Sequence, residues 1–162
     1  MKLVCNTIAT PLGPMLLAAS DAGLAGLWFE DQRYYPDGFG WQAVKSQRWL
    51  DQAAEEVQAY FRGQCRHFET RRAAAWGTPF QRNVWEALVA IPWGATTTYG
   101  TVAAQLHKPA AVRAVGAAVG RNPWSIMVPC HRVLGANGSL TGYAGGLARK
   151  QDLLRREGNP VP

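Results

Sequence analysis

One cysteine of the sequence stands in a setting that suits chemistry better than packing. The apolar run 126–128 stops at Pro129, and Cys130 is followed at once by His131 and Arg132. A thiol is a strong nucleophile only as a thiolate, and with a free pKa of about 8.5 it needs a base or positive charge nearby to ionise near neutrality. His131 is a candidate base and Arg132 supplies positive charge. An inert cysteine that packs as a small hydrophobe is the alternative.

An acid further along the chain fits the same chemistry. The spacing predicts a helix over residues 147–156 that Gly158 ends, so Glu157 falls in its last turn, where a negative charge opposes the helix dipole. Helix stability alone would not select an acid there. Glu157 can orient and polarise a histidine, in the order nucleophile, base and orienting acid. A surface pair with Arg155 or Arg156 is the other interpretation.

The segment between residue 78 and Cys130 is predicted to be mostly helical. Residues 126–128 predict a short buried strand that Pro129 ends, so the cysteine lies where the backbone turns away. Thr78 as N-cap and Pro79 in the first turn open a helix that continues to residue 91. Two short helices follow, over 99–106 and 109–120, joined by a turn so short that they resemble a helix-turn-helix. An ordinary helical hairpin has the same pattern.

The second of these helices carries almost only small side chains besides its inward valines. Arg113 is its one long basic residue. Small side chains allow close approach to a neighbouring helix or to a nucleic-acid groove, and a buried helix has little use for Arg113. The pattern favours the groove.

The first half of the chain predicts a small antiparallel sheet and a helix. Alternating strands are expected over 3–9, 15–19 and 24–30, and the following helix has an apolar stripe of Leu50, Ala54, Val57 and Phe61. Residues 64–76 look like a linker because apolar periodicity lapses there. We therefore expect two domains, an N-terminal α/β domain over 1–76 and a C-terminal domain over 77–162.

Charge and cysteine count narrow the class of protein. The chain has 162 residues and a net charge of +6. The whole excess lies in residues 77–162, which hold nine basic residues against three acidic ones, as a polyanion partner would require. A basic surface that serves solubility is the alternative. Three widely spaced cysteines argue against a disulfide framework or a structural zinc site, and we expect an intracellular protein without signal peptide or membrane span.

Five segments in order give the sequence a resemblance to a known family. "TPFQRNVWEAL", "TTTYGTVAAQL", "VRAVGAAVGRNP", "PCHRV" and "NGSLTGYAGGLARKQDLLRREG" closely resemble the O6-alkylguanine-DNA alkyltransferases, over about residues 77–158. "ATPLGPMLLAAS" is similar to the family's N-terminal strands. The resemblance implies an α/β (α+β) protein, with a ribonuclease H-like N-terminal domain of small antiparallel sheet and helix. The C-terminal domain over 77–162 would be the DNA-binding and alkyl-acceptor domain, mostly helical and winged-helix-like, with a helix-turn-helix.

The resemblance also implies a reaction and its residues. Cys130 would take an alkyl group from O6 of guanine, and less readily from O4 of thymine, in duplex DNA, and the protein would react once. His131 would deprotonate Cys130 through a water, Glu157 would hold His131, Asn122 would fix the turn that carries the cysteine, and Tyr99 would donate a proton to the base.

DNA contacts and the base pocket follow from the same resemblance. The base would be flipped out, Arg113 would take its place in the stack, and the small face of the second helix, with Ala114 and Ala117, would enter the minor groove beside Tyr99. The pocket residues would be Val133, Tyr143, Ala144 and Gly145. No cofactor and no metal are expected, because only Cys5 matches the N-terminal zinc ligands of some relatives. The partner would be double-stranded DNA that carries O6-alkylguanine, bound by a monomer, with cooperative binding along DNA left open.

Three alternatives remain open at this point. The chain could be a helix-turn-helix regulator, a cysteine hydrolase that uses Cys130 and His131, or a lesion-binding protein without transfer, although the presence of Cys130 opposes the last.

Overall fold

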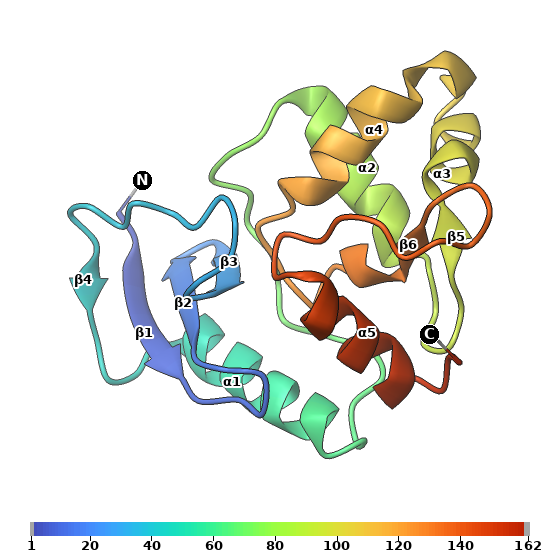
Figure 1. Ribbon diagram of the computed structural model, residues 1–162. Coiled ribbons are helices and arrows are strands. Elements are labelled where there is room, and N and C mark those ends of the chain that lie inside the picture. The colour runs from blue at the N-terminus through green and yellow to red at the C-terminus, as the bar shows by residue number, and fades with distance from the viewer. Residues whose placement is uncertain (1, 161–162) are drawn as a thin grey trace. The chain divides into compact units, whose positions relative to one another are not determined.

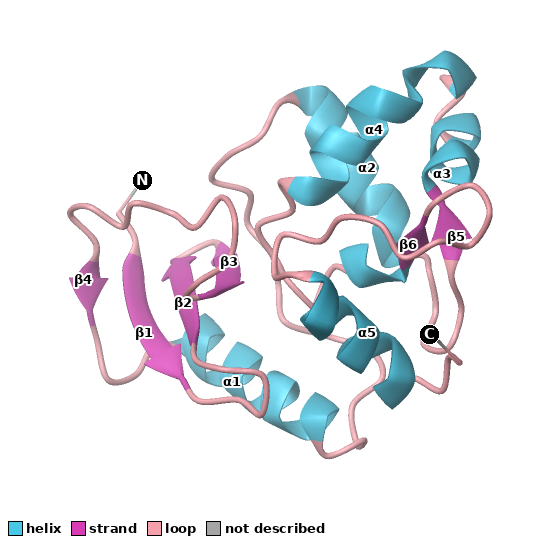
Figure 2. Cartoon of the chain, in the orientation of Figure 1, coloured by secondary structure: helices cyan, strands magenta, loops and turns pink. Residues whose placement is uncertain are grey.

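The computed structural model describes residues 2–160 and divides the chain into two compact units (Figure 1). Unit 1 contains the chain up to Trp76 together with Pro123–Met127, and unit 2 contains Gly77–Asn122 and the chain from Val128 onward. Residues 123–127, inside the stretch expected as the C-terminal domain, therefore pack with unit 1. The mixed α/β fold class predicted from the sequence is confirmed (Figure 2).

Unit 1 is a four-stranded sheet with one helix packed against it. The strands β1 (Val4–Ile8), β2 (Met15–Ser20) and β3 (Gly23–Phe29) form the expected antiparallel meander, and the short β4 (Gln42–Ala43) pairs parallel to β1 in the order β3-β2-β1-β4. The helix α1 (Arg48–Phe61) contacts β1, β2 and β3. Part of the core of the unit lies between this helix and the sheet, and a further core cluster consists of Leu3, Ala18, Ala25 and Trp28.

Strand β3 is buried along its whole length rather than alternating as predicted. Both faces are covered because Ala25 and Trp28 pack in a core cluster with Leu3 and Ala18, against which Trp41 and Ala75 also lie. The free edge of the strand is covered as well, because two remote segments pair with it. Leu24 donates to Arg71 O (2.7 Å) and accepts from Ala73 N (2.9 Å), and Leu27 donates to Pro123 O (2.8 Å). The expected linker over 64–76 is thus wrong in part, because residues 71–73 extend the sheet edge.

The inward face of α1 differs by one residue from the expected stripe. Leu50 and Val57 are buried as predicted, but Ala53 and Tyr60 join them in place of Ala54 and Phe61. In a helix of 3.6 residues per turn, positions three and four residues after Leu50 both lie near its face, so the surface against which the helix packs determines which of them is buried.

Unit 2 is mostly helical. A capping box between Thr78 and Gln81 opens α2 (Pro79–Val89), which ends two residues earlier than expected. The helices α3 (Tyr99–Gln105) and α4 (Val112–Gly120) contact each other and form the predicted helix-turn-helix, although Pro109–Ala111 is a 3₁₀ turn that precedes α4. The helix α5 (Leu147–Arg156) completes the unit.

The strand predicted over residues 126–128 is wrong. Ile126 has a φ of +71°, which an extended strand excludes and which is unusual for a β-branched residue. Tight turns follow, in which Met127 N donates to Ser125 O and Cys130 N donates to Val128 O, both at 2.8 Å. Cys130 therefore begins a 3₁₀ turn, Cys130–Arg132, rather than following a strand.

A two-stranded parallel pair that sequence analysis missed brings distant parts of unit 2 together. The strand β5 (Thr97–Thr98) pairs with β6 (Val133–Leu134), with Thr97 opposite Val133. Tyr99 follows β5 directly, and the turn with Cys130 precedes β6 directly. Two residues of each strand are enough to set Tyr99 near the cysteine turn.

Candidate active site

Unit 2 brings together the residues that the sequence singled out for chemistry. Cys130 and His131 lie in the 3₁₀ turn before β6, Tyr99 begins α3, Asn122 follows α4, and Glu157 is the C-cap of α5. Glu157 and both turn residues are buried. The alternative interpretation, a surface ion pair of Glu157 with Arg155 or Arg156, is therefore wrong.

The Cys130 thiol is held in a buried turn. Asn122 closes this turn, because its Nδ2 donates to Val128 O at 2.8 Å and its side chain also hydrogen bonds to Cys130. Burial raises the pKa of Cys130, while the Asn122 hydrogen bond and the positive charge of Lys150 act in the opposite direction. The thiol is thus the resting form, with groups in place that favour the thiolate.

His131 and Glu157 form a buried pair that fixes the role of each imidazole nitrogen. His131 Nε2 lies 2.7 Å from Glu157 Oε2, and because a carboxylate only accepts, Nε2 carries the proton. The buried Nδ1 is then a bare acceptor, and it has no hydrogen-bond partner among residues 2–160. Burial lowers the pKa of His131 despite Glu157, so the ring is kept neutral. A neutral ring with a free Nδ1 lone pair is the form that a general base needs.

Arg132 completes this buried group, in a role that sequence analysis missed. Its Nε donates to Glu157 Oε1 at 2.6 Å and its Nη1 donates to Ile91 O at 2.5 Å. The two oxygens of Glu157 are therefore bound by two consecutive residues, His131 and Arg132. A buried carboxylate needs such partners to remain charged.

Lys150 is the second functional candidate that the sequence analysis missed. Its side chain is fully buried, and Nζ donates to Val133 O (2.6 Å), Thr141 O (2.7 Å) and Gly142 O (3.2 Å). Burial lowers the pKa of Lys150 to about 8, and Cys130 acts in the opposite direction. All three ammonium hydrogens thus tie the loop after β6 to the strand beside the cysteine.

A signal for Lys150 was present in the sequence. Lys150 lies on the same helical face as Leu153, Leu154 and Glu157, at spacings of three, four and seven residues. A lysine on the apolar stripe of a helix is rarely without a buried partner.

The expected base-pocket residues lie around this loop. Tyr99 is half-buried, its hydroxyl hydrogen bonds to the Thr141 side chain, and burial raises its pKa, so the phenol stays protonated and can donate. Tyr143 and Ala144 are half-buried, whereas Gly145 is buried. The carbonyl of Val133, another of the expected pocket residues, accepts a hydrogen bond from Lys150.

The expected DNA-contact residues share an exposed face. Arg113, Ala114 and Ala117 are exposed on α4, while Val115, Ala118 and Val119 point inward. Gly116 lies next to Tyr99, since a Cβ added there would come within 3.8 Å of the Tyr99 ring. The small-residue face and the tyrosine are therefore neighbours.

Both halves of the chain match family models. Residues 3–71 match the 6-O-methylguanine DNA methyltransferase ribonuclease-like domain, and residues 79–159 match the DNA-binding domain of the same family. Curated relatives named methylated-DNA–protein-cysteine methyltransferase include those of Mycolicibacterium paratuberculosis and Salmonella typhimurium. The first is 46% identical over 97% of this chain and 93% of the relative, and the second is 44% identical over 98% and 97%.

Solved structures agree with these matches. A crystal structure of the Mycobacterium tuberculosis O6-methylguanine methyltransferase is 42% identical, covers 99% of this chain and 95% of its own, and has a TM-score of 0.88. A complex of the M. tuberculosis protein with DNA is 41% identical, covers 97% and 92%, and has a TM-score of 0.87. The identity, coverage and fold together show that this chain belongs to the 6-O-methylguanine DNA methyltransferase family.

Proposed function

We propose that this chain repairs DNA by moving an alkyl group from O6 of guanine to Sγ of Cys130, once per molecule. The observation that carries the proposal is the buried chain Cys130, His131 and Glu157, in which the histidine is held neutral with a bare Nδ1. A regulator that only binds DNA has no use for such a chain. The relatives named above are methylated-DNA–protein-cysteine methyltransferases, and one related structure contains DNA.

The proton path follows from the tautomer. Nδ1 of His131 accepts the Cys130 proton through a bridging water, and the imidazolium that forms is stabilised by Glu157. The thiolate then attacks the alkyl carbon, so the S–C bond forms as the C–O6 bond breaks and its electron pair passes to guanine. Tyr99 supplies a proton to the leaving base and is reprotonated from solvent, while His131 releases to solvent the proton that it took from Cys130. The net change exchanges S–H and C–O for S–C and a protonated base, and a thioether has no easy hydrolysis route.

The base must leave the duplex for Cys130 to reach it, at a cost of a few kcal/mol. Arg113 fills the vacated position in the stack, a role that is supported by its exposure on α4 beside the small residues Ala114 and Ala117. This face of α4 enters the minor groove, where small side chains permit close approach. Tyr143, Ala144 and Gly145 form the pocket of the flipped base.

Partner and location follow from the same proposal. The protein acts as a monomer on double-stranded DNA that carries O6-alkylguanine, and it works in the cytoplasm with that DNA. In residues 2–160, no helix is long and apolar enough to cross a membrane.

Incubation with DNA that contains O6-methylguanine should add one methyl mass to Cys130 and no more. Cys130→Ser should abolish this addition and retain DNA binding, because serine is a weak nucleophile but nearly the same shape. The matched control is Cys65→Ser, since Cys65 lies in unit 1 and should leave transfer intact. Peptide mass spectrometry reads the site. Repeated turnover, or an inactive Cys65 variant, would overturn the proposal.

Replacement of Glu157 by glutamine should slow transfer at neutral pH by tenfold or more. One amide oxygen cannot serve both Arg132 and His131, so the NH₂ group faces His131 and the histidine tautomer reverses, which removes the Nδ1 lone pair. Single-turnover rates measured against pH test this. In the wild type, transfer should fall as the pH drops through the lowered pKa of His131, because the protonated ring cannot accept.

The matched control for Glu157→Gln is Asp152→Asn. Asp152 lies in the same helix but pairs with Arg156 in a half-exposed position, so its loss should leave the pH profile unchanged. Equal transfer rates for Glu157→Gln and the wild type at every pH would show that Glu157 takes no part in the proton transfer from Cys130 to His131.

Substitution of Lys150 by methionine should slow transfer about tenfold and displace its pH profile upward. Methionine has similar length but donates nothing to the three carbonyls and leaves Cys130 without the nearby positive charge. Because neither effect involves the duplex, reaction with free O6-methylguanine should slow to the same extent. Arg155→Met, at an exposed site of the same helix, is the control. A slower rate with an unchanged pH profile would limit Lys150 to loop packing.

Arg113→Ala should slow repair of duplex DNA far more than reaction with the free base, which has no stack to leave. A simple phosphate contact would instead weaken binding to all DNA about equally and reduce the salt slope by about one. Arg113→Lys should rescue only in part, because lysine keeps the charge but lacks the planar group. Single-turnover rates on duplex DNA and on the free base distinguish insertion into the stack from a phosphate contact. If Arg113→Ala slows the reaction equally on both substrates, or if Arg113→Lys reacts at the wild-type rate, Arg113 does not insert into the base stack and is only a basic residue on a solvated helix face.

A further inference from the structure

Unit 1 contains a cluster of three indole rings that the alkyl-transfer chemistry does not use. Trp28 stacks on Trp41 with ring centroids 5.9 Å apart, and Trp76 meets Trp28 edge to face at 5.6 Å. The Trp41 and Trp76 ring centroids lie 6.0 Å apart and the ring planes are tilted by 43°, so the two rings contact each other and diverge as a wedge. Trp28 is buried in β3, whereas Trp41 is half-buried and Trp76 is exposed. The cluster therefore runs from the core to the surface.

The backbone that follows Trp41 and the backbone that precedes Trp76 are both hydrogen bonded to strands of the sheet or to their ends. Trp41 directly precedes β4, where Gln42 N donates to Leu3 O (3.3 Å) and Val44 N donates to Cys5 O (2.9 Å). Trp76 closely follows Ala73, which donates to Leu24 O of β3 at 2.9 Å. The rings are thus held in place before any ligand arrives, which lowers the entropy cost of binding.

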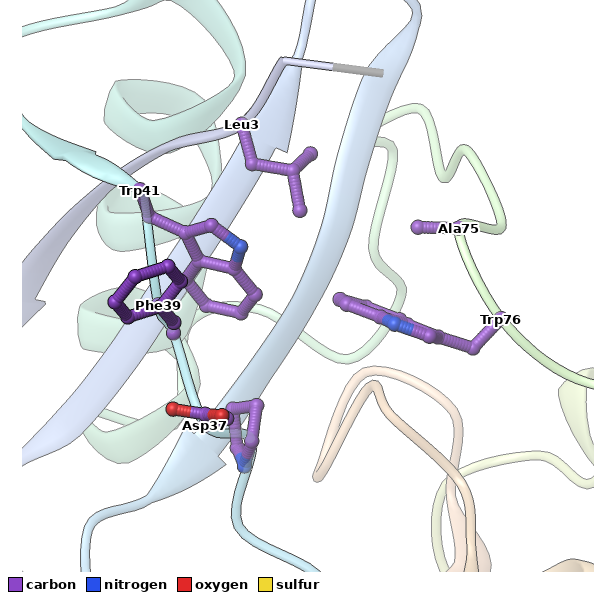
Figure 3. Close-up of a pocket in the computed structure, with 8 residues that line it drawn as sticks. Leu3, Asp37, Phe39, Trp41, Ala75 and Trp76 are labelled. Carbon is purple, nitrogen blue, oxygen red and sulfur yellow. The ribbon is translucent and has the colours of Figure 1, made fainter.

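The wedge opens into a pocket of about 470 Å³. Figure 3 shows Trp41 and Trp76 on opposite sides of this pocket, with Leu3 at one end, Asp37 at the other and Phe39 beside Trp41. Phe39 is 90% exposed and Trp76 is 38% exposed. Large aromatic side chains left in water at the rim of a pocket mark a binding surface more often than a packing accident.

Asp37 gives the pocket its charge. It is exposed, and within residues 2–160 it makes no hydrogen bond or ion pair, so its carboxylate is available to a ligand. Gly38, with a φ of +69°, follows it, and Trp41 N donates to Gly38 O at 3.1 Å. This turn holds the carboxylate at the end of the pocket between the aromatic walls.

From this combination we propose that the aromatic pocket of unit 1 binds an alkylated ammonium group. Indole faces attract a cation within about 6 Å of the ring centroid, and a carboxylate adds an opposite charge. Methyl groups on nitrogen suit the apolar walls and spread the charge. The same chemistry is offered by a small quaternary amine and by a methylated lysine side chain of a protein.

Titration with choline, observed through the indole N–H resonances of the ¹⁵N-labelled full chain, tests this proposal. The signals of Trp41 and Trp76, assigned through single Trp→Phe variants, should shift with a Kd on the order of 1 mM. The neutral isostere 3,3-dimethylbutan-1-ol, which keeps the shape without the charge, should bind at least tenfold more weakly. Equal binding of the isostere would overturn the proposal.

Two variants and one matched control complete the test. Asp37→Asn should weaken choline binding about tenfold, and Trp76→Ala should abolish it. Asp31→Asn changes an exposed acid that does not line the pocket and should bind as wild type. Unchanged binding by Asp37→Asn, or shifts spread over other indoles, would refute the site. Alkyl transfer should be unaffected by Asp37→Asn, since the proposal is independent of the proposed function.

A second titration separates the two sources of the cation. A short peptide with trimethyllysine is compared with the same peptide carrying unmodified lysine. Tighter binding of the methylated peptide than of choline assigns the pocket to a protein side chain, and equal affinity assigns it to the cation alone. Binding of the unmodified peptide at the same strength as the methylated one would overturn the preference for an alkylated ammonium.

Discussion

The active-site geometry of unit 2 depends on how the carboxylate of Glu157 is neutralised. Glu157 has no access to water, and its two oxygens are bound by His131 Nε2 and Arg132 Nε, from two consecutive residues of the turn that begins with Cys130. A buried charge without such partners would be strongly destabilising. The ion pair therefore joins the end of α5 to the cysteine turn. It also fixes the histidine tautomer, so one interaction serves both the fold and the chemistry.

The position of Glu157 at the end of α5 explains a feature that helix physics alone disfavours. Gly158 adopts a φ of +87° and ends the helix directly after Glu157, where the helix dipole repels an acid. Arg132 and His131 offset that repulsion from outside the helix. The energetic conflict is local, and a helix end that violates its own preference is the place where function is expected.

Sequence reasoning succeeded where a pattern is local and failed where a distant partner decides. The N-cap at Thr78, the helix stop at Gly158 and the helix-turn-helix depend on neighbours in the chain, and these predictions are confirmed. The full burial of β3, the turn at Ile126 and the β5–β6 pair depend on segments tens of residues away. Among the functional residues, three could be identified from their sequence context. A polar pair directly after an apolar run singled out Cys130 and His131, and an acid in the last turn of a helix singled out Glu157. Arg132 and Lys150 were missed because their partners are backbone carbonyls and a remote carboxylate.

Lys150 makes the site sensitive to the state of the cysteine. In the part of the chain that the structure describes, its ammonium is bound by three carbonyls and by no carboxylate. The Cys130 thiolate is the anion that favours the charged lysine, and the charged lysine in turn favours the thiolate. Since burial already lowers the pKa of Lys150 to about 8, the balance between ammonium and amine lies close to neutrality. An alkylated Cys130 cannot ionise, so the thiolate that favours the charged lysine can no longer form. The ammonium that ties the loop over residues 141–142 to β6 is then held by the three carbonyls and by the Tyr99 ring, whose centroid lies 5.9 Å away, and its charged form becomes harder to maintain as the pH rises.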